Sequence, residues 1–214
     1  MLFAVSASAQ QPAADASDKN QPEAAQLLSM AGQLVQYGYQ TKAALPLIQA
    51  VQIYQKVGVR PEEEAKTKTS DTAVTGDDQK AEGISYDQAK LLADAKTFAG
   101  SDKNLQALIK ECENAQTRGA VGGAITHRDR VLAGCTDSYT IRFRGGEVAY
   151  VVVNGDHDTD LDLYVYDENG NFIVADTDRT DICTVSFTPR WTGVFYVKIK
   201  NLGRVSNYYT LYTN

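Results

Sequence analysis

The sequence predicts an α+β protein in two regions, with N-terminal helical hairpins followed by an antiparallel, jelly-roll-like β-sandwich. Up to about residue 118, apolar residues recur at three- and four-residue steps, which is the period of an amphipathic helix. After residue 124 they alternate with polar residues in short runs, which is the period of a half-buried strand. The glycine-rich stretch 118–124 (RGAVGGA) separates the two patterns and is predicted to be a hinge.

Residues 1–21 are predicted to hold the remnant of a secretory signal followed by a disordered tail. The small residues Ala7, Ser8 and Ala9 fit a signal cleavage pattern, with Gln10 as the first mature residue. The apolar stretch before them is short and has no basic residue ahead of it, so a plain disordered tail is the alternative. The signal interpretation predicts a secreted or periplasmic protein.

Residues 22–118 form the predicted helical region. A first helix begins at Pro22 and is expected to stop at Gly38, and a second helix follows with Pro46 tolerated near its first turn. Residues 61–83 are rich in charge, Thr and Gly without any periodicity, so they are predicted to be a mobile linker.

A second predicted hairpin follows this linker. Ser85 is expected to start a third helix with Gln88 completing a capping box, and Ser101 to cap a fourth helix after Gly100 ends the third. Each hairpin is too thin to bury a core by itself. The two hairpins therefore predict either a tetratricopeptide-like unit or a cap that docks on the sandwich or dimerises.

Residues 125–214 are predicted to form the sandwich, because seven short runs follow one another without a helix between them. The runs cover residues 139–143, 148–152, 161–165, 172–175, 182–187, 194–199 and 208–212. Glycine-containing pairs mark turns between strands at Gly145-Gly146, Asn169-Gly170 and Leu202-Gly203.

Residues from about 130 to 214 resemble the bacterial pre-peptidase C-terminal domain. The resemblance rests on residues 160–167 (DLDLYVYD), 169–171 (NGN), 189–201 (PRWTGVFYVKIKN) and 209–211 (YTL). It implies a non-catalytic, jelly-roll-like module of secreted bacterial proteins, and in some relatives such modules bind calcium and an insoluble polymer. Nothing upstream resembles the peptidase that often precedes the module, and no contact motif for collagen can be matched.

Nine acidic residues lie between Asp156 and Asp181, against one basic residue, Arg179. A tight Asn169-Gly170 turn would place Asp158 opposite Asp181, so that two acidic runs converge at one end of a hairpin. Because calcium prefers carboxylate oxygens, the sequence predicts a calcium site here. Its predicted ligands are Asp156, Asp158, Asp160, Asp162, Asp176, Asp178 and Asp181. A solvated acidic loop, partly neutralised by Arg179, is the alternative.

Two aromatic side chains follow the same alternation. Tyr164 and Tyr166 share the strand face of Asp160 and Asp162, opposite the apolar positions 161, 163 and 165. If that face is open, Tyr164 and Tyr166 are predicted to form a ligand platform. The single tryptophan, at position 191, precedes a Thr-Gly pair and is predicted to anchor a corner of the sandwich.

Charge and motifs exclude several functions. A net charge of −6 over 214 residues argues against nucleic acid or an anionic membrane surface as partner, and the chain has no apolar run of about eighteen residues that would span a membrane. Two histidines and three cysteines match no zinc spacing, and neither G-x-S-x-G nor H-E-x-x-H is present. The pairing among Cys112, Cys135 and Cys183 stays open.

These patterns predict a secreted or periplasmic, non-catalytic binding module, stabilised by calcium, that engages a polysaccharide or a protein at the cell envelope or outside the cell. The alternative is a structural or assembly protein whose helical hairpins recruit a partner protein. A hydrolase that uses the Asp cluster is the least favoured class, because alternating Asp residues at a strand edge are ordinarily solvated.

Overall fold

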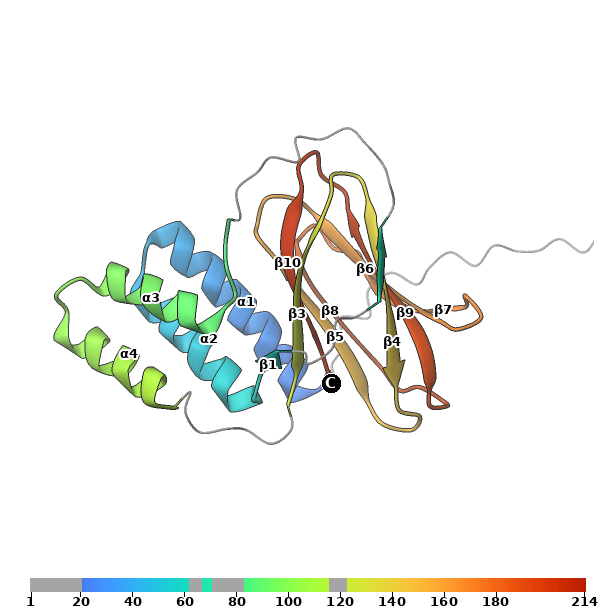
Figure 1. Cartoon of the computed structure of the whole chain (residues 1–214), viewed down its shortest axis with the longest axis horizontal. Helices are drawn as coiled ribbons and strands as arrows, with labels where there is room; N and C mark the ends of the chain where they lie inside the picture. Colours follow the sequence, from blue (N-terminus) through green and yellow to red (C-terminus); the bar gives the residue numbers. More distant parts are fainter. Residues whose placement is uncertain (1–20, 62–66, 71–82, 116–122) are drawn as a thin grey trace, which may run out of the picture.

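The computed structural model describes residues 21–61, 67–70, 83–115 and 123–214. The helices among them are α1 (Glu23–Thr41), α2 (Ala44–Val57), α3 (Gln88–Ala99) and α4 (Lys103–Ala115). The strands are β1 (Arg60–Pro61), β2 (Lys68–Ser70), β3 (Ile125–Val131), β4 (Thr136–Phe143), β5 (Ala149–Gly155), β6 (Leu161–Asp167), β7 (Phe172–Asp176), β8 (Ile182–Phe187), β9 (Gly193–Asn201) and β10 (Asn207–Thr213). The predicted α+β fold, helical hairpins followed by a β-sandwich, is confirmed (Figure 1).

The sandwich consists of two five-stranded sheets packed face to face. Sheet A has the strand order β1-β3-β10-β5-β8, and sheet B has the order β2-β4-β9-β6-β7. Alternate residues of each strand point between the sheets, as Phe195, Val197 and Ile199 do on β9. Leu161, Leu163 and Val165 of β6 are buried in the same core, on the side that their alternation predicts.

The helices cover the outer face of sheet A, so the protein has three layers (Figure 1). Every residue of β5 is buried, because Tyr150 and Val152 join the core of the helices while the residues between them point into the sandwich. Tyr54 of α2 stacks on Tyr212 of β10, with ring centroids 5.8 Å apart. The sheet thus supplies the core that two thin hairpins lack.

Helix α1 continues past Gly38, where the sequence predicts its end. The helix runs to Thr41 and stops at Lys42, which adopts the left-handed conformation with a φ of 51°. Gly38 instead lets α2 approach closely, because a Cβ atom there would lie 2.5 Å from Cδ2 of Leu47. The glycine serves helix packing and not helix termination.

The N-terminal caps of α3 and α4 are aspartates and not the predicted serines. Asp87 accepts a hydrogen bond from the Lys90 N–H, and Asp102 caps α4 in the same manner. An ionised carboxylate is a strong acceptor at a helix N-terminus. Ser85 is buried instead and accepts a hydrogen bond from Arg128.

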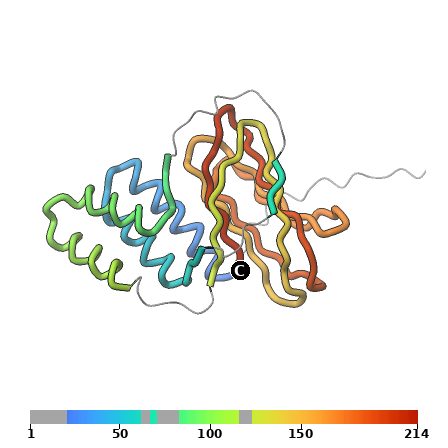
Figure 2. The backbone as a smooth tube through the Cα atoms, in the orientation of Figure 1, coloured from blue at the N-terminus to red at the C-terminus, as the bar shows by residue number. Residues whose placement is uncertain are grey.

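Part of the predicted mobile linker 61–83 forms strands. β1 pairs in parallel with β3 in sheet A, and β2 pairs antiparallel with β4 in sheet B. Figure 2 shows β2 beside β4, on the far side of the sandwich from the helices. The prediction is wrong for residues 67–70, because Lys68 Nζ lies 2.8 Å from Asp129 and 3.1 Å from Asp137.

Several expectations lie outside the described residues. These include the signal remnant and tail at 1–20, the linker residues 62–66 and 71–82, and most of the hinge at 118–124. None of the described helices is long and apolar enough to cross a membrane.

Candidate functional site

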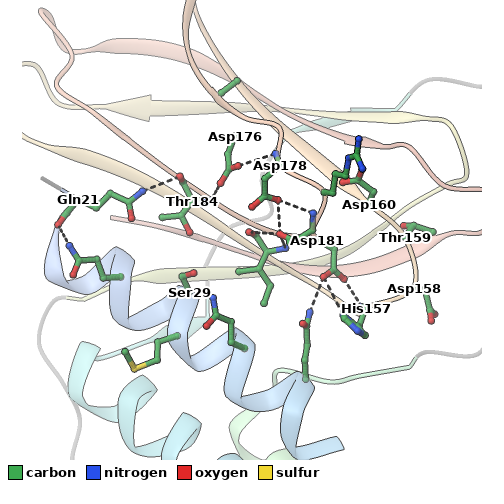
Figure 3. A pocket seen from close by; sticks show the side chains of 18 residues that line it. Gln21, Ser29, His157, Asp158, Thr159, Asp160, Asp176, Asp178, Asp181 and Thr184 are labelled. Carbon is green, nitrogen blue, oxygen red and sulfur yellow. Dashed lines mark hydrogen bonds and ion pairs between the residues drawn. The ribbon is translucent and has the colours of Figure 1, made fainter. Parts of the chain in front are cut away.

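An open groove of about 700 Å³ lies between α1 and the loops that precede β6 and β8 (Figure 3). Helix α1 and Gln21, which lies two positions before it, supply Gln and Met side chains to one wall, and the sandwich supplies the acidic wall. The polar and apolar lining residues are Gln21, Gln26, Ser29, Met30, Gln33, Gln36, His157, Thr159, Ala175, Thr180, Ile182 and Thr184. The charged lining residues are Asp158, Asp160, Asp176, Asp178, Asp181 and Arg179.

Five of the seven predicted metal ligands therefore line this groove. The other two are buried: Asp156 follows β5, and Asp162 lies on β6, where it accepts a hydrogen bond of 2.7 Å from the Tyr164 hydroxyl. Asp158 and Asp181 both line the groove, but they do not face each other in the β6–β7 ladder as the sequence predicts. The fold thus brings most of the acidic run to one place.

The predicted hairpin register holds only in the middle of the β6–β7 pair and fails at both of its ends. Tyr164 lies opposite Ala175 and Val165 opposite Val174, as a turn at 169–170 predicts, before a bulge next to the turn shifts the register. The ladder ends at Asp176, because the chain then crosses to sheet A. Asp181 consequently accepts through its C=O from Gly155 N–H at 2.8 Å, at the end of β5.

Buried Asp181 joins the helical region to the sandwich. Its carboxylate accepts from Gln36 Nε2 of α1 at 2.9 Å and from the main-chain N–H of His157. His157 holds this position with a φ of 71°, in the left-handed region. The Asp181 carboxylate is therefore committed to structural hydrogen bonds.

Other groove carboxylates also have partners. Asp176 accepts from the Thr184 N–H at 2.7 Å, and Asp178 accepts from the Thr180 hydroxyl at 2.7 Å. Burial raises the pKa of Asp160, and the neighbouring carboxylates of Asp162 and Asp178 raise it further. No group of three or more His, Cys, Asp or Glu side chains within the described part of the chain is arranged to hold a metal ion. The calcium site stays a prediction.

If calcium binds this groove, millimolar calcium should raise the melting temperature by several degrees, because a ligand that binds only the folded state stabilises it. Differential scanning calorimetry with calcium, magnesium or chelator measures the shift. The double variant D158N/D160N should remove it. A melting temperature that is the same in calcium and in chelator would leave the solvated acidic loop as the explanation.

An aromatic row lies on the outer face of sheet B. The rings of Tyr164 and Tyr166 are 6.5 Å apart and nearly parallel, and Phe172 meets Tyr166 edge-on at 5.9 Å. Lys198 Nζ lies 4.9 Å from the centre of the Tyr166 ring. Phe172 is 42% exposed, and Ile173 beside it is also exposed. We call Tyr164, Tyr166 and Phe172 the aromatic row.

Trp191 packs at a corner of the sandwich, where the sequence predicts an anchor. Its ring lies 6.2 Å from that of Phe195 and nearly parallel to it. A Cβ atom on Gly145 would lie 2.6 Å from the main chain of Trp191, so this corner requires a glycine. The three cysteines, whose pairing the sequence leaves open, are buried free thiols.

No family model matches the chain, and no curated protein matches it. Among solved structures, the chain is similar to the pre-peptidase C-terminal domain of a collagenase from Bacillus anthracis, with 15% identity and a TM-score of 0.37, over 42% of this chain and 87% of that one. It is also similar to PliG of Aeromonas hydrophila, a periplasmic inhibitor of g-type lysozyme, with 11% identity and a TM-score of 0.33, over 42% and 84% of the two chains.

Proposed function

We propose that this protein is a secreted or periplasmic, non-catalytic binding module that engages a polysaccharide or another polymer through the aromatic row of sheet B. The observation that supports this most is the position of the row. Helices cover the outer face of sheet A, whereas the outer face of sheet B points away from them (Figure 1). Solvent-facing positions of an antiparallel sheet are ordinarily polar, so contiguous rings there favour a ligand.

The groups around the row suit a sugar polymer. Rings of Tyr164 and Tyr166 offer flat apolar surfaces, and the hydroxyl of Tyr164 and the ammonium of Lys198 lie beside them. Burial raises the pKa of Tyr164, and the hydrogen bond to Asp162 raises it further. The hydroxyl therefore stays protonated at neutral pH, and because its hydrogen is donated to Asp162, its oxygen can accept a hydrogen bond from a ligand.

A binding role fits the acidic groove better than hydrolysis does. The carboxylates of Asp176, Asp178 and Asp181 are engaged by main-chain or side-chain donors of the protein itself. The sequence also has no motif for a nucleophile or a catalytic metal. These observations support a module that binds without turnover.

The double variant Y164A/Y166A is expected to lose retention on insoluble polysaccharides by at least tenfold, because stacking surfaces dominate such contacts. A pull-down with a panel of insoluble glycans measures the bound fraction. Tyr37→Ala is the matched control, since Tyr37 is exposed on α1, away from sheet B. If Y164A/Y166A were retained as well as the wild type and Tyr37→Ala, the aromatic row would not be the binding surface.

Exposed apolar side chains on the helices favour a second candidate, recruitment of a partner protein. Met30 and Tyr37 of α1 are 51% and 57% exposed, and Leu45 at the start of α2 is 45% exposed. Co-purification of one defined partner that is lost in M30S/Y37S, but kept in Y164A/Y166A, would favour this assembly role.

A further inference from the structure

Strand β8 forms one edge of sheet A, and this edge borders the acidic groove. In the β5–β8 ladder Thr184 stands opposite Val152. The N–H of Thr184 donates to Asp176 Oδ2 at 2.7 Å, and its C=O accepts from Gln21 Nε2 at 3.3 Å. Both main-chain groups therefore point away from β5, toward the groove.

Single side chains occupy the places where a neighbouring strand would bind. Gln21 and Asp176 cover the main chain of Thr184. The Thr180 hydroxyl accepts from the Ile182 N–H at 3.3 Å and lies 3.2 Å from the Ile182 C=O, while its hydrogen is donated to Asp178 over the shorter distance of 2.7 Å. Native sheets usually shield their edges. Here the shield consists of separate hydrogen bonds that an incoming main chain would replace one for one.

The groove wall also contains an unsatisfied hydroxyl. Thr184 is only 8% exposed, and its buried Oγ1 has no hydrogen-bond partner among the described residues. Its side chain lines the groove, on the face of β8 that looks toward α1 (Figure 3). Because buried polar atoms in native proteins are nearly always bonded, this oxygen points to a bound molecule.

The charge of the groove selects the kind of ligand. Five aspartates line it against one arginine, Arg179. Like charges held this close repel one another, so a cation placed among these aspartates would relieve the repulsion. Side chains of an extended strand project to the same side about every 7 Å. Alternate Lys or Arg residues would therefore meet the acidic wall.

We propose that the groove binds an extended, positively charged segment of a partner protein, which adds as a strand to the β8 edge of sheet A. The main chain of the segment would replace the Gln21 and Asp176 contacts at Thr184, and its basic side chains would pair with the aspartates. The volume of about 700 Å³ is in the range of ligand sites. The β8 edge belongs to the opposite sheet from the aromatic row, so variants of the two sites change different residues.

The chain's own N-terminal segment is a poorer occupant. Gln21 begins the described chain beside the groove. However, the side chains of residues 1–20 carry two negative charges, Asp15 and Asp18, against one positive charge, Lys19. A net negative segment would be repelled by an acidic wall.

Three synthetic peptides of about eight residues test the proposal with the full chain. The first alternates lysine with threonine or valine, the second replaces lysine by glutamate, and the third is the basic peptide with alternate main-chain nitrogens methylated. By fluorescence anisotropy, the basic peptide should bind, the acidic one should not, and the methylated one should bind at least tenfold more weakly. Exchange of the Thr184 amide hydrogen should slow when the basic peptide is bound.

Variants test separately the main-chain edge at Thr184 and the aspartates of the groove. Gln21→Ala frees the C=O of Thr184 and should tighten binding about two- to fivefold, whereas Gln40→Ala, on α1 but outside the groove, should not change it. The triple variant D158N/D160N/D178N should weaken binding about tenfold and reduce its dependence on salt.

Three results would overturn the proposal. Equal binding of the methylated peptide would show electrostatic attraction without strand addition. No binding of the basic peptide at about 1 mM would exclude the site. Binding only after removal of residues 1–20 would mean that the chain's own segment is the occupant. Polymer retention in the same variants is measured separately, so a failure here is distinguishable from a failure of the aromatic row.

Discussion

Replacing Tyr54 with alanine is expected to lower the free energy of unfolding by about 3–5 kcal/mol. The Tyr54 ring is fully buried between the helices and sheet A and stacks on Tyr212 of β10. Its loss opens a cavity at the junction of two layers, so both the helical core and the cover of sheet A are weakened. Urea denaturation followed by far-UV circular dichroism and by Trp191 fluorescence measures the change.

The matched control is Tyr37→Ala. Tyr37 is 57% exposed on α1, so this variant should change the free energy of unfolding by no more than about 0.5 kcal/mol. One coincident transition in both signals is expected for wild type and variants. If Y54A instead lost helical signal while Trp191 unfolded at the wild-type urea concentration, the helices and the sandwich would be separate domains.

Replacing Lys68 with methionine should destabilise the protein by about 3 kcal/mol at neutral pH. Lys68 of β2 lies between Asp129 and Asp137, at 2.8 and 3.1 Å. Asp137 is almost completely buried and also accepts from Ser70 at 2.6 Å and from Tyr209 at 2.7 Å. Removal of the ammonium leaves two neighbouring carboxylates without this counter-charge, and β2 loses its ion pairs with β3 and β4.

The cost of K68M should shrink as the pH falls. Burial is the largest influence on the pKa of Asp129 and raises it, but hydrogen bonds from His127 and Lys68 outweigh burial and hold this pKa well below its usual range. A lowered folded pKa contributes stability above the pKa of an unfolded aspartate, near about 4. That contribution is lost as the pH drops through this value toward the folded pKa.

Denaturation of wild type and K68M at pH 7 and pH 3 tests this expectation. An equal difference at both pH values would mean that the variant loses packing and not charge pairing. Lys56→Met is the control, because Lys56 and Glu23 form an exposed ion pair on the helices. Its unfolding midpoint should stay at the wild-type value.

Strands β5 and β3 show how far local pattern predicts this fold. The alternation at 148–152 predicts a strand. It cannot predict that β5 is buried on both faces, because helices from another part of the chain cover the second face. β3 (ITHRDRV) is absent from the predicted strands since polar residues fill its middle. It pairs with β10 along its whole length, and Asp129 is accommodated by Lys68 and Tyr139.

The candidate sites, like the strands, can be predicted from local sequence only in part. The concentration of aspartates and the side-chain parity of Tyr164 and Tyr166 can be identified from neighbouring residues. The wall of the groove formed by α1 cannot, because Gln36 and Asp181 are 145 positions apart yet lie 2.9 Å from each other. The only local signal for this wall is a series of Gln residues on the polar side of the first predicted helix.

By itself, the amino-acid sequence determined the four helices and strands β4 to β10, the buried side of β6 and the accumulation of negative charge before β6 and β8. These features depend on residues within a few positions of one another. The side-chain periods of about 3.6 residues in a helix and 2 in a strand are therefore enough to predict them. Only the tertiary structure decided that the helices complete sheet A, that Lys68 joins the sandwich and that the acidic loops face α1. Those contacts depend on which apolar faces remain to be buried once each element has formed, and that is a property of the assembled layers.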